Sequence, residues 1–364
     1  MNSTNATHTT MSELKVDAEA LEAFTVNALK KTGLSDADAR TTAQVLVTTD
    51  TWGVFTHGVN SLHRYIQRLM ARGLNPRGVP TIVSEGPAWA RVDGQNSIAM
   101  VTSVRAMEIA IAKAKHCGIA YVGVFNTCHF GAAGYYATMA AEQNMLGIAM
   151  ANDAPSMNAP GARGRVTGNN PLAFAIPMKP RKPIVLDMAL STVAGGKVSA
   201  AYINGKPIPP DWVVDTEGNP SSNPADFING GSLSPMAGYK GYGIAIVVET
   251  LAAIMPGASM LADVLKWKID DVATPTGHGA AFIAIDVEKM MPIETYQARA
   301  EQMAARIKAC PTRTAADRIL MPGEREWDTR ERALRDGIVL PADVVLSLRE
   351  LCAELKLDFD ALRR

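Results

Sequence analysis

Hydrophobic residues recur at helical spacing near both ends of the chain. In DAEALEAFTVNALKKTG, Leu21, Phe24 and Leu29 fall on one face, Asp17 is placed to cap the start, and Gly33 suits the left-handed position after the last turn. The same spacing predicts further helices over residues 35–52, 59–73, 293–310 and 341–358. These segments favour a mainly helical domain that is built from both chain ends.

The predicted helix over residues 59–73 has an apolar face and a basic face. Leu62 and Ile66 lie on the apolar face, whereas Arg64, Arg68 and Arg72 lie on the basic one. Arginines at this spacing most often form a solvated face. We therefore expect the three guanidinium groups to point to solvent.

The pattern changes after the Pro/Gly-rich segment GLNPRGVP, where strand-like runs begin. These runs are AWARVDG, IAYVGVFN, LGIAMAN, LAFAIPM, PIVLDMA and AAFIAIDV, and a helix that ends at Gly118 separates the first two. We predict an α+β protein with a mixed sheet. The expected divisions are a loose tail over residues 1–12, a helical domain over 13–77, a sheet domain over 78–255, and a C-terminal part over 256–364 that returns one strand near 280–287 and completes the helical domain.

Composition excludes several classes of partner. The 36 basic residues balance the 36 acidic ones, so nothing favours general binding to nucleic acid or to an acidic membrane. The most apolar segment, GIAIVVETLAAIMPG, is too short to cross a bilayer and carries Glu249, which favours a buried helix. The N-terminus lacks the features of a secretory signal, and the four cysteines form no CxxC pair. We expect reduced thiols and a cytoplasmic protein.

Common cofactor and metal motifs are missing from the sequence. No GxGxxG opens a βαβ unit, and no GxxxxGK[ST] is present, so a standard Rossmann site and a P-loop are not supported. The six histidines form no HExxH, and no Cys/His cluster has the spacing of a zinc site. We predict no metal, and a dinucleotide would have to bind in another way.

His129 is the first candidate for chemistry. It follows the predicted strand IAYVGVFN and precedes a helix that starts near Ala132, with Gly131 between them. The free N–H groups of a helix start hold anions and lower the pKa of an imidazole, which favours the neutral form that a general base needs. The alternative is a partly buried histidine bonded to a carbonyl, and position alone leaves both readings open.

Two further positions carry weaker signals. His57 lies between two predicted helices, beside Thr56, whose hydroxyl either helps the histidine or simply caps the next helix. Asp187 ends the apolar strand PIVLD before a run of small residues, where a carboxylate either contacts a ligand or caps a turn.

Two glycine-rich loops combine a flexible backbone with a cation. GARGRVTGNNP carries Arg163 and Arg165, and MAGYKGYG carries Lys240. Such loops suit a phosphate or a carboxylate, although a plain surface turn has the same composition.

Five blocks of the chain, spread over about residues 15–340, resemble in order those of the type-2 malate/L-lactate dehydrogenase family. They are THGVNSLHRY, NTCHFGAAGYYATMAAE, GNNPLAFAIP, VLDMALSTVAGGKV and GYKGYGIAIVVETLAAIM. The family includes sulfolactate and ureidoglycolate dehydrogenases, diketogulonate reductase and piperideine-2-carboxylate reductase. The resemblance implies an oxidoreductase that uses NAD or NADP on a non-Rossmann domain with a mixed sheet, and a homodimer whose active site lies near the subunit interface.

The resemblance also implies roles for single residues. His129 matches the proton donor and acceptor, His57 with Thr56 matches the Ser-His pair that faces the substrate, and Tyr65 matches a substrate-side tyrosine. The positions that match cofactor contacts are Asp153, Asp187, Met188, Ala189, Lys240 and the PGE segment with Gly323 and Glu324.

Three departures from the family pattern bear on the substrate. Ser61 stands where an arginine usually clamps the substrate carboxylate, so either Arg64 or Arg163 replaces that arginine or the substrate is a different one. Asn169 replaces a threonine, and Asp153 adds a carboxylate that favours an amine or imine. We expect a small 2-oxo or 2-hydroxy acid as substrate. The alternatives are a cyclic imino acid, or a dinucleotide-binding protein without turnover.

Overall fold

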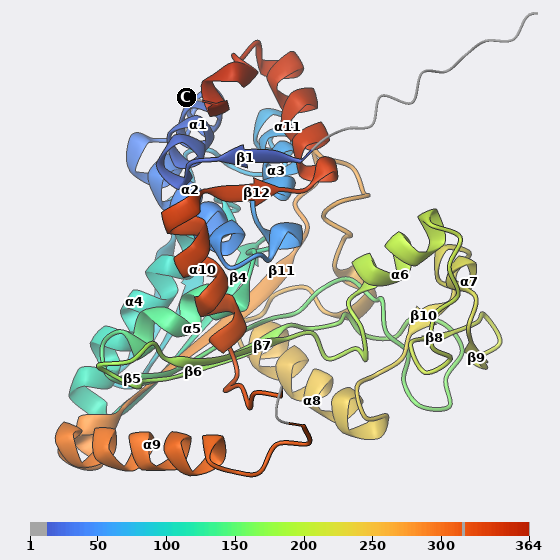
Figure 1. Cartoon of the computed structure of the whole chain (residues 1–364). Helices are drawn as coiled ribbons and strands as arrows, with labels where there is room; N and C mark the ends of the chain where they lie inside the picture. Colours follow the sequence, from blue (N-terminus) through green and yellow to red (C-terminus); the bar gives the residue numbers. More distant parts are fainter. Residues whose placement is uncertain (1–12, 315–316, 364) are drawn as a thin grey trace, which may run out of the picture.

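In the computed structural model, which describes residues 13–314 and 317–363, seven strands form one mixed sheet in the order β2-β3-β4-β11-β5-β6-β7 (Figure 1). The strands are β2 (Thr81–Gly86), β3 (Trp89–Asp93), β4 (Ile119–Thr127), β5 (Met145–Ala151), β6 (Leu172–Ile176), β7 (Ile184–Met188) and β11 (His278–Asp286). Strands β3 and β4 are parallel, and the other neighbouring pairs are antiparallel. The predicted α+β class with a mixed sheet is confirmed. The predicted tail lies outside the described residues.

Both faces of the sheet are covered, which explains why its central strands are apolar throughout. Helices α4 (Ala99–Cys117) and α5 (Ala133–Ala141) cover one face. The other face carries α8 (Tyr239–Glu249), which continues as the π-helix η3 (Thr250–Ile254). Alternate residues of β4 divide between the two sides, so that Val122 packs in the α4–α5 core and Tyr121 packs in the α8 core.

Antiparallel pairing brings several chain segments to one edge of this sheet. β4, β5 and β7 end at that edge, and β6 and β11 begin there, as the pairing of His278 with Thr127 and of Leu172 with Met188 requires. The residues that follow or precede these strands therefore lie close together, although they are far apart in the sequence.

Helices from both ends of the chain pack together above this edge. They are α1 (Ala18–Lys30), α2 (Asp36–Thr51), α3 (Leu62–Met70) and α11 (Ala342–Leu355). Figure 1 shows the blue N-terminal and red C-terminal segments side by side, and β1 (Leu14–Val16) pairs there with β12 (Ile338–Leu340). The side chains of Asp17 and Ser35 cap α1 and α2.

Two parts of the fold differ from the prediction. Helix α9 (Ile293–Lys308) was expected to complete the helical domain, but it packs through Ala300 and Ala304 against Ile184 of β7. A small module with its own core was not foreseen. It comprises α6 (Gly195–Ile203), β8 (Val213–Val214), β9 (Pro220–Ser221), α7 (Pro224–Ile228) and β10 (Ser232–Leu233).

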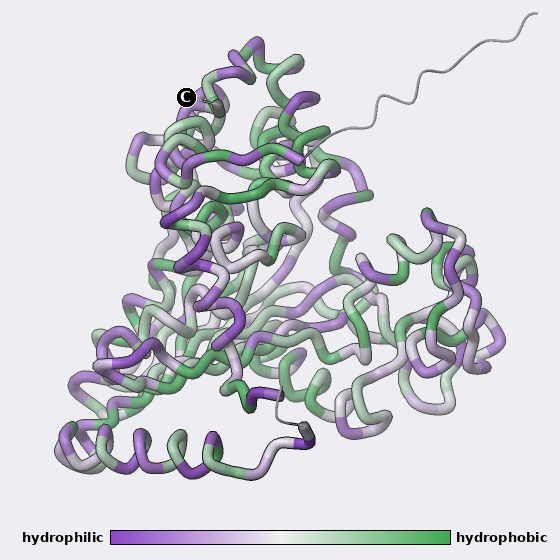
Figure 2. Tube along the Cα trace, in the orientation of Figure 1, coloured by the Kyte–Doolittle hydropathy of each residue, from purple (hydrophilic) through white to green (hydrophobic). Residues whose placement is uncertain are grey.

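The remaining elements are connectors around these units. They are α10 (Glu324–Asp336) and the 3-10 helices η1 (Phe55–His57), η2 (Val59–Ser61), η4 (Leu261–Asp263), η5 (Val287–Lys289) and η6 (Phe359–Arg363). Figure 2 shows α8 in largely hydrophobic colours, although no helix within the described ranges is both long and apolar enough to span a membrane.

Candidate active site

A cavity of about 540 Å³ opens at the sheet edge where the strand ends meet η1 and the start of α10. Nine of the predicted site residues line it. They are Thr56, His57, His129, Asp153, Asn169, Asp187, Met188, Ala189 and Gly323. The strand register gathers most of them, because β4, β5 and β7 end at this edge and β6 begins there.

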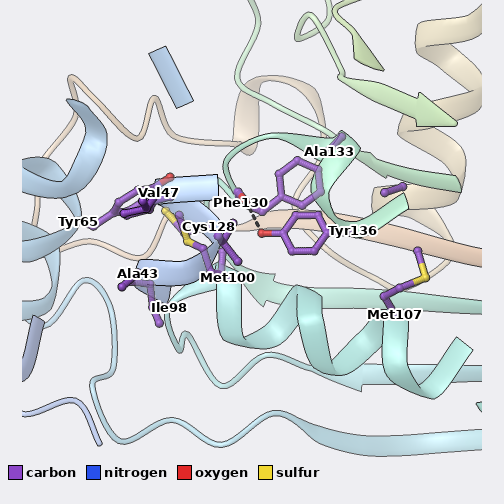
Figure 3. Close-up of a cluster of buried hydrophobic side chains, with 14 of the residues drawn as sticks. Ala43, Val47, Tyr65, Ile98, Met100, Met107, Cys128, Phe130, Ala133 and Tyr136 are labelled. Atoms are coloured by element: carbon purple, nitrogen blue, oxygen red, sulfur yellow. Dashed lines mark hydrogen bonds between the residues drawn. The ribbon is translucent and has the colours of Figure 1, made fainter. Parts of the chain in front are cut away.

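His129 is held from behind by Tyr65, which α3 presents to it. The Tyr65 hydroxyl lies 2.5 Å from His129 Nδ1 and 3.4 Å from the His129 carbonyl oxygen. Burial raises the pKa of the Tyr65 phenol well above its usual range, so the hydroxyl keeps its proton. With Nδ1 engaged, Nε2 is the ring nitrogen left for a ligand. Figure 3 shows Tyr65 near Val47 and Cys128 in the apolar cluster that supports this strand end, with Phe130 next to Tyr136 farther along it.

The environment of His129 favours a neutral ring. Burial is the main cause that lowers the pKa of the imidazole well below its usual range, and His57, Lys268 and His278 lower it further. The start of α5 was expected to supply this effect. The structure instead places the Asp187 carboxylate at that helix start, where it accepts a hydrogen bond from the Gly134 N–H at 2.7 Å.

His57 lies beside His129, with ring centres 5.5 Å apart. Its Nδ1 is 2.9 Å from the hydroxyl of Thr56, which therefore contacts the histidine. Burial lowers the pKa of His57 to about 4, and Lys268 lowers it too, whereas Asp153 acts in the opposite direction. Both rings are therefore in the neutral form near neutral pH, each with one N–H.

The glycine after His57 is required by packing. Val59 N–H donates to Asp50 Oδ2 at 2.9 Å, and a Cβ at Gly58 would lie 1.8 Å from Asp50 Oδ1. Burial raises the pKa of the Asp50 carboxyl well above its usual range. The Asp50 side chain thus fills the space beside Gly58 and fixes the turn that presents His57.

Asp153 has a partner that the sequence did not reveal. Its Oδ1 lies 3.2 Å from Nε2 of His278, and the other ring nitrogen of His278 is 2.9 Å from the Thr276 hydroxyl. His278 is buried at the first position of β11, which reaches the site only because β11 lies between β4 and β5. His278 could be assigned to the site only from the pairing of β11 with its neighbouring strands, which the sequence alone does not show.

Asp187 stands between helix α5 and the cavity. Asp187 is an exposed residue where it borders the open cavity, but its carboxyl group is surrounded by protein atoms. This burial raises its pKa to about 6, against the hydrogen bond from Gly134, which lowers it.

Several predicted contacts do not reach the cavity. Ser61 is buried, and its hydroxyl donates to the Thr56 carbonyl at 3.3 Å, so it supports the His57 turn instead of meeting a substrate. The Tyr65 hydroxyl contacts His129 and not the cavity. Lys240 is exposed at the start of α8 and is not one of the residues that line the cavity.

The remaining predicted cations and Glu324 have other partners. Arg64 donates to the carbonyls of Trp267 and Asp270, so its guanidinium cannot clamp a substrate carboxylate. Arg163 forms an exposed ion pair with Glu217. The Glu324 carboxylate accepts from Lys308, whereas its neighbour Gly323 does line the cavity.

The cavity has the size and the lining of a small-molecule or cofactor site. Its volume falls within the range of about 300–1,000 Å³ typical of cofactor pockets. Its walls include the small residues Gly131 to Gly134, the Asp187 carboxylate and Lys197, a cation that the sequence analysis did not single out. Small residues admit a ligand close to the backbone, and the carboxylate offers an acceptor for ribose hydroxyls. Among the described residues, no group of three or more His, Cys, Asp or Glu side chains is placed to hold a metal ion.

Comparison with known proteins gives one consistent family. A sequence model described as malate/L-lactate dehydrogenase matches residues 16–349. The malate dehydrogenase of Pyrococcus horikoshii is 35% identical over 345 residues, covering 93% of this chain and 94% of the relative. The L-sulfolactate dehydrogenase of Methanocaldococcus jannaschii is 35% identical over 338 residues, covering 92% and 95% of the two chains.

The solved structure of that sulfolactate dehydrogenase superimposes with a TM-score of 0.89 at 33% identity and covers 96% of this chain and 100% of its own. A more distant relative is the Delta(1)-pyrroline-2-carboxylate/Delta(1)-piperideine-2-carboxylate reductase of Pseudomonas putida. It is 29% identical over 343 residues, which cover 94% of this chain and 98% of the reductase.

Proposed function

Because the chain belongs to the malate/L-lactate dehydrogenase family, we propose that it catalyses reversible hydride transfer between the nicotinamide of NAD or NADP and C2 of a small 2-oxo or 2-hydroxy acid. The predicted family and the assignment as an enzyme of the oxidoreductase class are confirmed. The observation that carries the proposal is the pair of neutral histidines, His57 and His129, in the wall of a cavity suited to a dinucleotide.

His129 moves the proton at the substrate oxygen. In oxidation its Nδ1–H donates to the Tyr65 hydroxyl, the hydroxyl donates to the His129 carbonyl oxygen, and the free lone pair on Nε2 takes the proton from the substrate hydroxyl. The imidazolium that results keeps both of these hydrogen bonds. In reduction the same Nε2–H protonates the oxygen that forms at C2. His57 and Thr56 orient that oxygen or the carboxylate.

The cofactor supplies the hydride chemistry, and the chain supplies binding and orientation. Asp153, Asp187 to Ala189 and Gly323 line the cavity and would hold it. The binding domain is the mixed sheet with the helices that cover it, without a Rossmann fingerprint, and the mainly helical domain from both chain ends closes the cavity from above. Lys240 and Glu324 lie outside the cavity, so they are not included in this proposal.

The main alternative substrate is a cyclic imino acid. The P. putida relative is named as a reductase of such compounds, and the Asp153 carboxylate in the cavity wall favours a protonated imine. The pairing of Asp153 with His278 spreads that charge, which favours the 2-oxo acid instead.

A substrate panel tests the proposal. Oxidation of NADH and NADPH is followed by absorbance with pyruvate, oxaloacetate, sulfopyruvate and piperideine-2-carboxylate. We expect the highest kcat/KM with one of the three 2-oxo acids, and a higher value with the cyclic imine would favour the alternative. If the cofactor fluorescence changes on binding but none of the four compounds causes oxidation of NADH or NADPH, enzymatic turnover would be contradicted. The chain would then be a dinucleotide-binding protein without turnover.

We also propose a homodimer and a cytoplasmic location. The dimer is supported by an apolar face that runs along α8 and η3, beside the exposed Lys240, and ends at the residue after η3. Its members are Tyr239, Ile246, Val247, Ile254 and Met255. All four cysteines are free, as in proteins of a reducing compartment.

A further inference from the structure

We propose that Trp267 is a positioning residue for proton transfer: its indole covers the Tyr65–His129 pair, and Arg68 with Arg64 fixes the loop that carries it. This inference rests on the proposed function, because it concerns the imidazole that moves the proton. Neither the cavity lining nor any sequence motif points to Trp267.

The indole stacks on both rings of the pair. Its ring centre lies 4.1 Å from that of His129 and 5.0 Å from that of Tyr65, and its plane is within 12° and 13° of theirs. The two covered rings are joined by the hydrogen bond at Nδ1. Trp267 itself is 6% exposed. An apolar plate in this position keeps water from the imidazole face and restricts rotation of the ring about its side-chain bonds.

The loop that carries Trp267 has little structure of its own. It runs from η4 to β11 without a helix or strand, so its backbone carbonyls need partners. Arg68 provides them: its guanidinium is fully buried and donates to the carbonyls of Trp267 at 2.8 Å, Thr274 at 3.0 Å, Asp271 at 3.2 Å and Asp270 at 3.3 Å. Arg64 adds bonds to Asp270 at 2.8 Å and to Trp267 at 3.3 Å.

These contacts correct the expected solvated face of α3. Arg64 and Arg68 are one helical turn apart, and Tyr65 lies between them in the sequence. One short helix therefore places the hydroxyl at Nδ1 and also anchors the loop that lays the indole over the ring. The buried Arg68 guanidinium donates to backbone carbonyls and not to a carboxylate, so its role is to hold the loop that carries Trp267.

The electrostatic surroundings of His129 come from several elements. Tyr65 of α3, His57 of η1, His278 of β11 and Lys268 of the loop face the ring, and Asp153 bonds to His278. Burial is the largest cause of the lowered pKa of His129, and the indole forms one wall of that burial. Loss of the indole admits water to the ring and returns the pKa toward its usual value.

The direct test is an NMR titration of His129 in protein labelled at histidine, with the resonance assigned from the His129→Asn variant. Trp267→Leu fills space without stacking, and Trp267→Phe keeps an aromatic ring. We expect the wild-type and Trp267→Phe resonances to stay constant from pH 8 to pH 6, and the Trp267→Leu resonance to titrate with a pKa raised by about one unit or more. Arg68→Lys, which keeps the charge and loses the fork of donors, should shift in the same direction. Trp89→Phe and Arg72→Lys, both exposed, serve as matched controls.

Kinetics complete the test. We expect Trp267→Leu to lower kcat by about 10- to 100-fold with KM for the cofactor within a few-fold of wild type. An unchanged His129 titration in folded Trp267→Leu and Arg68→Lys would overturn the inference, and if the leucine variant does not fold, the Arg68→Lys result decides. A wild type that turns over none of the panel substrates would contradict the proposed function. The NMR titration would still test the effect of Trp267 on His129, because it does not depend on turnover.

Discussion

Gly58 shows how a single residue fixes the turn that presents His57. The space that a side chain would need is filled by the Asp50 carboxyl group, with 1.8 Å between Asp50 Oδ1 and a Cβ built at Gly58. We expect Gly58→Ala to push this turn outward, to destabilise the fold by roughly 1–3 kcal/mol and to lower kcat through His57. Gly196→Ala is the control, because nothing lies near its Cβ position. Thermal unfolding and turnover measure both, and equal melting temperatures would contradict this packing.

Asp187 gives a prediction about pH. Its pKa of about 6 means that the carboxyl group gains a proton as the pH falls through 6 and then accepts hydrogen bonds less well. We expect the Kd of the wild type for NADH to rise below about pH 6. Asp187→Asn should bind about tenfold more weakly at pH 8, with little further change on acidification. Fluorescence titrations from pH 5 to 8 measure this, with Asp211→Asn as the exposed control. Parallel pH curves for wild type and Asp187→Asn would contradict the role of Asp187.

Residues with a local signal could be found from the sequence, and residues with only distant partners could not. His57 directly precedes Gly58, His129 lies two residues before Gly131, and both stand at the ends of predicted elements, whereas Asp187 ends an apolar strand. The structure brings all three to the cavity. Trp267 and His278 reach the site through loop packing and strand order, which no pattern in the neighbouring sequence predicts.

At the scale of elements, a buried carboxylate joins three segments beneath the cavity. Glu249, at the end of α8, accepts from Asn170 Nδ2 at 2.9 Å, from Leu261 N–H at 2.8 Å and from Asn152 Nδ2 at 3.4 Å. It thereby ties the end of β5, the segment before β6 and the start of η4 to the helix.

We predict that Glu249→Ala lowers the free energy of unfolding by roughly 3 kcal/mol or more, because it leaves buried donors without acceptors. Glu249→Gln, which retains one oxygen, should lose less. Urea unfolding measures the change, and Glu331→Ala on the exposed face of α10 is the control. A loss for Glu249→Ala no larger than that of the control would contradict the network.

Element positions followed from periodicity more readily than element packing did. The apolar run of β4 and the capped starts of α1 and α2 lie where hydrophobic spacing placed them. The module around β8 to β10 was missed because two-residue strands have no pattern to read. The prediction that the basic face of α3 is solvated was wrong for Arg68, which binds loop carbonyls. Arginines one turn apart have the same sequence pattern whether they face solvent or bind a loop.

At the scale of the whole molecule, the apolar face of α8 predicts self-association. Val247 is 55% exposed near the middle of that face. In a dimer through α8, Val247→Arg would bury an unpaired charge, so we expect the wild type to sediment as a dimer and the variant as a monomer.

The control is Leu334→Arg, since Leu334 is 54% exposed on α10, outside that face. Sedimentation velocity at micromolar concentration distinguishes the species. A monomeric wild type, or a Val247→Arg variant that remains dimeric, would contradict an interface through α8.

Strand order is the feature of the whole molecule that the sequence predicted least. β11 comes late in the chain and lies between β4 and β5, which places His278 beside Asp153. The class of sheet followed from the apolar runs, whereas the insertion depends on pairing across a long separation that propensity does not encode.

The most direct test of the account is turnover by His129→Asn, compared with His116→Asn, an exposed histidine at the end of α4. For the panel substrate that the wild type reduces best, we predict that kcat of His129→Asn falls by about 10²- to 10⁴-fold while the Kd for the cofactor stays within a few-fold and His116→Asn behaves as wild type. A kcat for His129→Asn within a few-fold of wild type would contradict the central claim that this imidazole moves the proton.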